Sequence, residues 1–265
     1  MEISSDKLSR AIIGKAMEVH RELGPSVNEY FDHELMVDKL TAAGIEHDSK
    51  PRRELVHKGQ VADIFEPDIV VGSRFVLELK WLWGNFAPEH FVQTKCYLKF
   101  WRIPDALLFD FGKESLIQRR YFFTDQPAPS LSVDELLSNM PATIQSASLA
   151  RRLGEAICEI NGNYGLGYRD TTYRGLLCAE LLMTNTPCVL EPLATIRSSD
   201  RVLGTTTLGC MAVANQCAVM VLALRNEIRA ADRARLQSAL RHLGFDWGLV
   251  VNFGKKQTAV KWVSV

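Results

Sequence analysis

Asp68, Glu78 and Lys80 are the residues of this chain whose types and spacing could do chemistry. They lie in the stretch 67–80, PDIVVGSRFVLELK, which predicts two strands joined by a tight turn. Because side chains alternate along a strand, Glu78 and Lys80 should share one face while Leu79 points into the opposite layer. Two carboxylates beside an ammonium suit a hard divalent cation, Mg²⁺ or Mn²⁺, with the lysine next to the water that the ion activates.

The pattern PD-x9-ExK is short, and the alternative is a solvated strand end with an ordinary salt bridge. Two further residues make chance less probable. Glu29 opens a predicted helix after a Gly-Pro turn, and Gln93 lies in the helix that follows the hairpin. Each has its own alternative: Glu29 could simply complement its helix dipole, and Gln93 could be a surface amide.

The helices and strands predicted for the first half position these residues. Apolar spacing and Gly or Pro breaks predict the order α-α-β-β-β-β-α-β-β. The predicted helices span 6–23, 28–43 and 88–100, and the predicted strands span 54–57, 60–65, 69–71, 74–79, 106–111 and 115–123.

Length and composition place the chain among ordinary globular proteins. Its 265 residues suit one large domain or two smaller ones, and 31 acidic against 31 basic residues give no overall charge for a polyanionic partner. The six cysteines contain no CxxC pair, so buried reduced thiols are expected rather than disulfides or a metal cluster. With neither a signal-peptide pattern nor an apolar stretch of membrane-spanning length, a cytoplasmic location without membrane contact is expected.

The second half repeats the plan of the first. We predict a domain at 1–125, a linker at 126–145 and a second domain at 146–265. The repeat rests on three matches: Gly24…Glu29 with Gly165…Asp170, Gln93 with Gln237, and Phe111-Gly112-Lys113 with Phe253-Gly254-Lys255.

The second copy should lack the chemistry of the first. Aligning Arg225 with Lys80 puts Ala223 at Glu78, and Met211 falls near Asp68. Asp170 and Gln237 alone cannot hold a cation.

With these residues in place, the first half resembles the GxxExxY subgroup of the PD-(D/E)XK nuclease superfamily. The resemblance is carried by a helix and turn of the form IIG…EVHRELGP, followed by the hairpin acids, the E-x-K, the helix glutamine and the late strand LLFDFG. It departs at the naming motif, where Ser26 and Asp32 replace the glycine and the tyrosine. The second half is similar more faintly and keeps Gly167, Asp170 and Tyr173.

The resemblance implies a mixed α/β (α+β) restriction-endonuclease-like fold, a mixed sheet flanked by helices, in two tandem copies. It implies that Asp68 and Glu78 bind Mg²⁺ or Mn²⁺ with the backbone carbonyl of Leu79, and that Glu29 acts through a water or at a second ion. Lys80 would orient or help to deprotonate the attacking water. Gln93 would position water or phosphate.

Other residues are weaker candidates for contact with nucleic acid. His20, Arg151 and Arg152 could touch phosphates, although a buried hydrogen-bonded histidine and a solvated charged face explain them as readily. The tryptophans Trp81, Trp83 and Trp101 could stack on bases, with core or rim packing as the alternative. The repeated FGK is expected to be a strand-end turn, because the rest of a phosphate loop is missing.

Taken together, these observations predict a metal-dependent nuclease acting on nucleic acid, with DNA preferred, built as an internal pseudo-dimer with a silent second copy. The main alternative is an inactive nuclease-like scaffold that binds nucleic acid or a protein. An unrelated α/β hydrolase ranks below both because the sequence has no nucleophile elbow.

Overall fold

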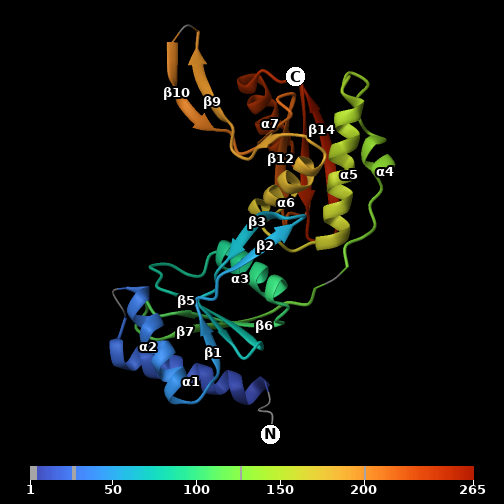
Figure 1. Cartoon of the computed structure of the whole chain (residues 1–265). Coiled ribbons are helices and arrows are strands. Elements are labelled where there is room, and N and C mark those ends of the chain that lie inside the picture. Colours follow the sequence, from blue (N-terminus) through green and yellow to red (C-terminus); the bar gives the residue numbers. More distant parts are fainter. Residues whose placement is uncertain (1–4, 26–27, 126, 200) are drawn as a thin grey trace. The chain divides into compact units, whose positions relative to one another are not determined.

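The chain forms two compact units (Figure 1). The computed structural model describes residues 5–25, 28–125, 127–199 and 201–265. The first unit comprises Met1–Arg53 and Ile64–Thr124, and the second comprises Glu54–Asp63 and Asp125–Val265. The segment Glu54–Asp63 from the first half of the chain and the segment 126–145, which was predicted as a linker, both belong to the second unit.

The first unit is a five-stranded mixed sheet with helices against it. The strand order is β1-β4-β5-β6-β7, in which β5 and β6 are parallel and the other neighbours are antiparallel. Its elements are α1 (Ser5–Leu23), α2 (Glu29–Ala42), β1 (His47–Ser49), β4 (Ile69–Val71), β5 (Phe75–Lys80), α3 (Pro88–Trp101), β6 (Asp105–Asp110) and β7 (Ile117–Phe122).

Alternation along β5 and β6 separates the core from the candidate chemistry. Leu77, Leu79, Leu107 and Phe109 are fully buried in one core cluster with apolar residues of α1 and α2. Glu78 lies between two members of that cluster on β5, so its side chain points to the other face, where α3 packs against β5 and β6. The predicted mixed α+β fold is confirmed, including this division of faces.

The second unit repeats the sheet with the same neighbours, in the order β14-β13-β12-β11-β8. Its elements are β2 (Arg53–His57), β3 (Gln60–Phe65), α4 (Val133–Leu137), α5 (Ala147–Tyr164), α6 (Asp170–Met183), β8 (Cys188–Val189), β9 (Leu193–Ser198), β10 (Arg201–Thr207), β11 (Met211–Val213), β12 (Cys217–Ala223), α7 (Ala230–Leu243), β13 (Trp247–Phe253) and β14 (Thr258–Ser264). The terminal residues Arg53, Ile64 and Phe65 of the β2–β3 pair belong to the first unit.

Strand pairing corrects the register predicted for the repeat. Val71 pairs with Phe75 in the first sheet, and Val213 pairs with Cys217 in the second, 142 positions later. The same offset relates the two parallel strand pairs. It places Met220 at the position of Glu78, so the predicted counterpart Ala223 is wrong by three residues.

The remaining counterparts of the site follow from this register. Leu222 stands where the first unit has Lys80, instead of Arg225, and Cys210 stands where it has Asp68. Helices α3 and α7 begin and end 142 residues apart, so Arg235 rather than Gln237 corresponds to Gln93. The prediction that the second copy lacks the hairpin acids holds in the corrected register.

The segment predicted as a linker is packed in its second part. Leu136 and Ile144 are buried, and the indole Nε1 of Trp262 donates to the carbonyl of Leu136 at 3.0 Å. The expectation of reduced cysteines is wrong for one pair, because Cys178 on α6 and Cys188 at β8 form a disulfide across the turn between these elements. Among the described helices, none has the length and apolar character needed to cross a bilayer.

Candidate active site

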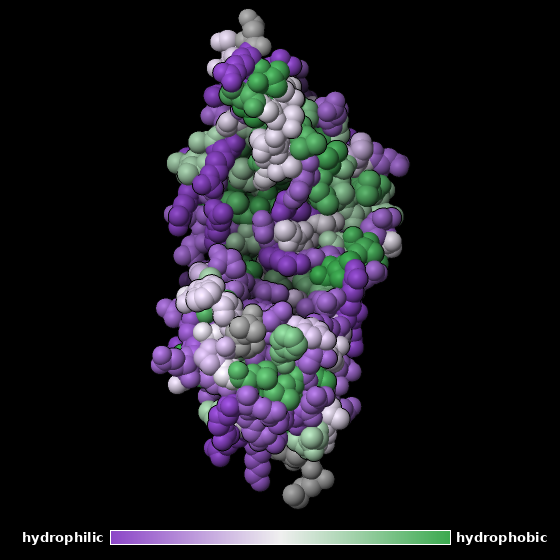
Figure 2. All heavy atoms as spheres, turned by 90° about the vertical axis from the view of Figure 1, so that its left-hand side faces the viewer, coloured by the Kyte–Doolittle hydropathy of each residue, from purple (hydrophilic) through white to green (hydrophobic). Residues whose placement is uncertain are grey.

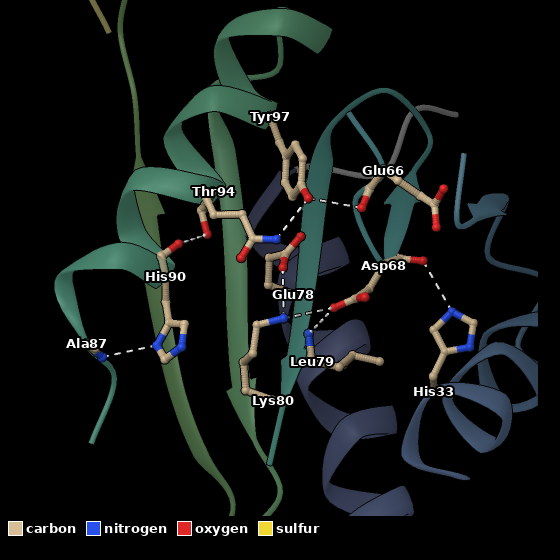
Figure 3. A network of polar contacts seen from close by, with 11 residues as sticks. His33, Glu66, Asp68, Glu78, Leu79, Lys80, Ala87, His90, Thr94 and Tyr97 are labelled. Atoms are coloured by element: carbon tan, nitrogen blue, oxygen red, sulfur yellow. Dashed lines mark hydrogen bonds and ion pairs between the residues drawn. The ribbon is translucent and has the colours of Figure 1, made fainter. Parts of the chain in front are cut away.

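The hairpin strands β4 and β5 separate at Asp68, at the end that carries the candidate residues. Ile69 is paired with Leu77, and the next residue back from Asp68 is Pro67, which has no N–H to offer the ladder. At this point the Asp68 carboxylate replaces a backbone acceptor: its Oδ2 accepts a hydrogen bond from the backbone N–H of Leu79 at 2.7 Å (Figure 3). This bond fixes Asp68 beside the last residues of β5.

Lys80 joins the two acids. Its Nζ donates to Glu78 Oε2 at 3.1 Å and lies 3.6 Å from Asp68 Oδ2. Figure 3 shows the ammonium group between the two carboxylates. The structure therefore brings together Asp68, Glu78 and Lys80, as their spacing predicted.

Glu78 is the most buried member of the set, at 1 % exposed, and no described atom is hydrogen bonded to its Oε1. Burial raises the pKa of Glu78 to about 8, and the charge of Asp68 adds to this, against the opposing effect of Lys80. Burial alone would lower the pKa of Lys80, but the carboxylates of Glu78, Asp68 and Glu29 raise it overall. Lys80 therefore stays charged beside a carboxyl group that holds its proton.

Replacing Glu78 by glutamine should stabilise the metal-free protein increasingly as the pH rises. The folded pKa of Glu78, about 8, exceeds its ordinary value of 4.5. The stability of the wild type is thus complete below pH 4.5 and is lost as the pH rises through about 8, because the unfolded chain ionises first. Glutamine resembles the protonated acid and avoids this loss, for which a pKa shift of this size sets an upper bound of about 5 kcal/mol.

The measurement is the melting temperature of wild type and Glu78→Gln, in the presence of a chelator, from pH 4 to pH 9. The gap between the two curves should be near zero at the acid end and should widen toward alkaline pH. A gap that is constant or narrows with pH would show that the substitution acts through packing alone.

Glu29 and Gln93 reach the same region from two helices. Glu29 begins α2 and is half-buried; burial raises its pKa, while the charge of Lys80 opposes this and that of Asp68 adds to it. Gln93 on α3 donates its amide Nε2 to the hydroxyl of Tyr97 at 2.9 Å. Both predicted residues thus lie on elements that face the hairpin.

Two residues that the sequence did not single out hold the segment before β4. The buried ring of His33 has its Nε2 3.2 Å from the carbonyl oxygen of Asp68, and Tyr97 donates its hydroxyl to the carbonyl of Glu66 at 3.0 Å (Figure 3). His33 comes from α2 and Tyr97 from α3, so Asp68 is positioned by both helices. Since Tyr97 also accepts from Gln93, the spacing of four residues between them on α3 was the available signal.

The repeated FGK forms the expected strand-end turn and braces the loop after β5. Asp110 Oδ1 accepts the backbone N–H groups of Leu82 and Gly112, both at 3.0 Å. Lys113 Nζ donates to the carbonyls of Leu82 and Trp83 at 2.5 and 2.8 Å. A Cβ at Gly112 would lie 2.9 Å from the Leu82 backbone, so only glycine allows this approach.

The tryptophans near this loop occupy different environments. Trp83, at 89 % exposed, packs its ring edge-on against Trp81, with centroids 4.9 Å apart. Trp81 and Trp101 are half-buried.

The candidates for contact with nucleic acid lie outside this cluster. His20 is 8 % exposed, and its Nε2 lies 2.8 Å from the carbonyl oxygen of Lys113, which is the buried alternative. Arg151 and Arg152 lie on α5 of the second unit, where Arg151 is exposed and Arg152 donates to the hydroxyl of Thr186 at 3.0 Å. Asp32, at the tyrosine position of the naming motif, is fully buried, and Ser26 lies outside the described residues.

The side chains of this site provide some, but not all, of the ligands that a divalent cation needs. Within the described ranges, no group of three carboxylate, imidazole or thiol side chains is arranged to hold a metal. Asp68 and Glu78 nevertheless provide two hard oxygen donors, and the buried Glu78 Oε1 is an acceptor that no described donor satisfies. A cation would satisfy this oxygen, so the donor set is suited to Mg²⁺ or Mn²⁺.

Comparison with known proteins points to the same family for both halves. The family model described as "PD-(D/E)XK nuclease superfamily" matches residues 6–121 and again residues 147–264. The curated proteins contain no match. A solved structure described as "Crystal structure of SSO0001" has 11 % sequence identity and a TM-score of 0.25, covering 60 % of this chain and 89 % of its own, a likeness too weak to add to the argument. Because the two matches together span well over half of the sequence, the chain belongs to the PD-(D/E)XK nuclease superfamily.

Proposed function

We propose that the first unit hydrolyses phosphodiester bonds in a nucleic acid, with DNA as the expected substrate, in the presence of Mg²⁺ or Mn²⁺. The observation that carries this proposal is the convergence of Asp68, Glu78 and Lys80 where β4 and β5 separate, with an unsatisfied carboxylate oxygen at its centre. An acid pair with an adjacent lysine is the donor set that metal-assisted hydrolysis requires.

Each residue has a role that its position supports. Asp68 and Glu78 would hold the cation together with the carbonyl of Leu79, and Glu29 would act through a water molecule or a second ion. When bound, the ion would supply Lewis acidity and lower the pKa of a water molecule.

Lys80 would orient that water and counter the charge that develops on the phosphate in the transition state. Gln93, held by Tyr97, would position water or phosphate.

The second half is proposed as a non-catalytic partner of the first. Its Cys210, Met220 and Leu222 stand at the positions of Asp68, Glu78 and Lys80 and offer no hard oxygen ligand. We also assign the first half to the GxxExxY subgroup, on the match of Glu29 and the hairpin motif. Retention of a silent copy is explained if the two halves form an internal pseudo-dimer that binds nucleic acid.

A catalytically inactive scaffold is the second candidate. One observation favours it: Lys80 Nζ already lies 3.1 Å from Glu78 Oε2 and 3.6 Å from Asp68 Oδ2, so both acidic side chains have a polar partner without a metal. In that case the network would stabilise the hairpin, and the chain would bind nucleic acid or a protein without cutting.

Titration calorimetry with Mn²⁺ separates the two candidates. The wild type should bind Mn²⁺, and Asp68→Asn should weaken binding by at least about tenfold because a ligand is lost. Asp170→Asn is the matched control, since Asp170 occupies the helix start of the second copy that corresponds to Glu29, and it should bind Mn²⁺ like the wild type. Equal affinity in all three proteins, or heat too small to detect in the wild type, would favour the scaffold.

A further inference from the structure

The hairpin formed by β2 and β3 comes from the first half of the sequence but packs into the second unit. His57 Nδ1 lies 2.9 Å from the hydroxyl oxygen of Tyr164, and His57 Nε2 lies 2.6 Å from Glu180 Oε2. These partners come from α5 and α6, the helix pair of the second unit. The hairpin tip is thereby fixed on both helices.

The other end of the contact lies at the start of α6. Arg169 donates to Asp63 Oδ1 at 2.9 Å, and the Thr172 hydroxyl also donates to Asp63. In the next turn the backbones almost touch, because a Cβ at Gly175 would lie 1.9 Å from the carbonyl oxygen of Ala62. The contact between β2–β3 and the α5–α6 pair is therefore close and specific.

The second half has a counterpart of this hairpin, β9–β10, which is exposed. Ser198 and Arg201 pair at its turn, and they lie 141 positions after His57 and Gln60, the residues that flank the turn of β2–β3. All seven residues of β10 are exposed, including Val202 and Leu203, at 50 % and 57 %. Figure 1 shows the hairpin projecting, and Figure 2 shows apolar atoms gathered near its end.

The helix pair α1–α2 of the first unit carries a matching apolar surface. Leu23, Tyr30 and Phe31 are exposed, Phe31 at 53 %, and the rings of Tyr30 and Phe31 contact edge to face at 5.4 Å. In the repeat, Leu23 and Phe31 stand where the second unit has Tyr164 and Thr172, two residues that hold β2–β3.

Compared with the contact between β2–β3 and α5–α6, the corresponding hairpin and helix pair both present large apolar side chains. Polar groups join β2–β3 to its helices, whereas β9–β10 presents Leu203 at the position of Ala62, and α1–α2 presents Leu23 and Phe31. Glu34 replaces Gly175, so the backbones cannot approach as closely as they do in the second unit. Larger apolar side chains on both sides would fill that wider gap.

We propose that β9–β10 docks on the α1–α2 surface of a second copy of this chain, forming a reciprocal dimer. Leu203 on the hairpin and Leu23 and Phe31 on the helix pair are exposed, and an exposed strand that carries large apolar side chains is an aggregation liability. Each copy supplies one hairpin and one helix pair, so two-fold pairing covers both surfaces at once and doubles the buried area. The contact lies at the start of α2, one residue from Glu29. This proposal does not depend on nuclease activity.

Sedimentation velocity of the full chain tests the dimer. At micromolar concentration, the molar mass obtained for the wild type should be twice the chain mass of 29.8 kDa. Leu203→Asp and Phe31→Asp should each give the monomer, because each places a charge in the apolar contact. An equimolar mixture of the two variants should recover part of the dimer, since one of its two contacts then has both surfaces intact.

The control is Val61→Asp, the same change on an exposed valine of the docked hairpin, which should leave the dimer mass unchanged. Circular dichroism confirms folding, and Leu203→Ser replaces Leu203→Asp should the latter misfold. A monomeric wild type overturns the proposal. So does a dimer that survives Phe31→Asp, or loss of DNA binding in Leu203→Asp with no change of mass, which would make the hairpin a nucleic-acid ribbon.

Discussion

Lys80→Ala is expected to lower Mg²⁺- or Mn²⁺-dependent cleavage by about 10²–10³-fold, the effect typical of removing one charged stabiliser from a transition state. Lys80 Nζ lies 3.1 Å from Glu78 Oε2 and 3.6 Å from Asp68 Oδ2, so its loss removes the one side-chain cation described beside both acids. The protein should still fold, because Leu77, Leu79 and the rest of that core are untouched.

The assay follows cleavage of single- and double-stranded DNA and of RNA, with Mg²⁺, Mn²⁺ or a chelator. Lys256→Ala is the matched control, since it removes an equal charge from an exposed turn of the second unit and should cleave like the wild type. Thermal melts verify that both variants are folded. Equal rates for Lys80→Ala and wild type would remove Lys80 from the catalytic group and count against the proposed mechanism.

Gly175→Ala is expected to destabilise the second unit by about 3 kcal/mol, the upper part of the range for overpacking. The added Cβ would lie 1.9 Å from the carbonyl oxygen of Ala62, and backbone on both sides leaves no flexible side chain to move away. The hairpin β2–β3 must then shift, which weakens the bonds of His57 and Asp63 to the helices.

Gly162→Ala is the matched control for this prediction. Gly162 also lies inside a helix, α5, but a Cβ there has no atom within 4 Å. Alanine should leave stability unchanged or increase it by up to about 1 kcal/mol, because it restricts the unfolded chain. The measurements are the melting temperature and hydrogen exchange of residues 54–63, which should become faster only in Gly175→Ala. Equal melting of the two variants would show that the close approach does not hold the hairpin.

The sequence by itself determined the parts of the site that depend on local pattern. The hairpin 69–80, the shared face of Glu78 and Lys80, and the helices that carry Glu29 and Gln93 were all predictable. Strand alternation and helix breaks involve residues only a few positions apart, so they can be read without the fold. The mixed α+β class followed from the resemblance that these residues carried.

Only the tertiary structure decided which distant groups meet. His33 and Tyr97 support Asp68 from two helices through backbone carbonyls, and carbonyl partners leave no mark in a sequence. The counterpart predicted for Glu78 in the second copy was wrong by three residues. Strand pairing, and not the similarity of residue types, shows that Met220 occupies the equivalent position. The disulfide between Cys178 and Cys188 likewise depends on how the turn after α6 brings β8 back beside that helix.

The same distinction applies to the two hairpins and to the candidate site. The strands of the β2–β3 hairpin were predictable from the sequence. The attachment of this hairpin to the second unit was not, because it depends on Gly175 and His57, which are far apart in sequence. Residue types showed that Asp68, Glu78 and Lys80 could hold a cation. Burial of Glu78, which raises its pKa and leaves one oxygen unsatisfied, was decided by the packing of α3 against β5.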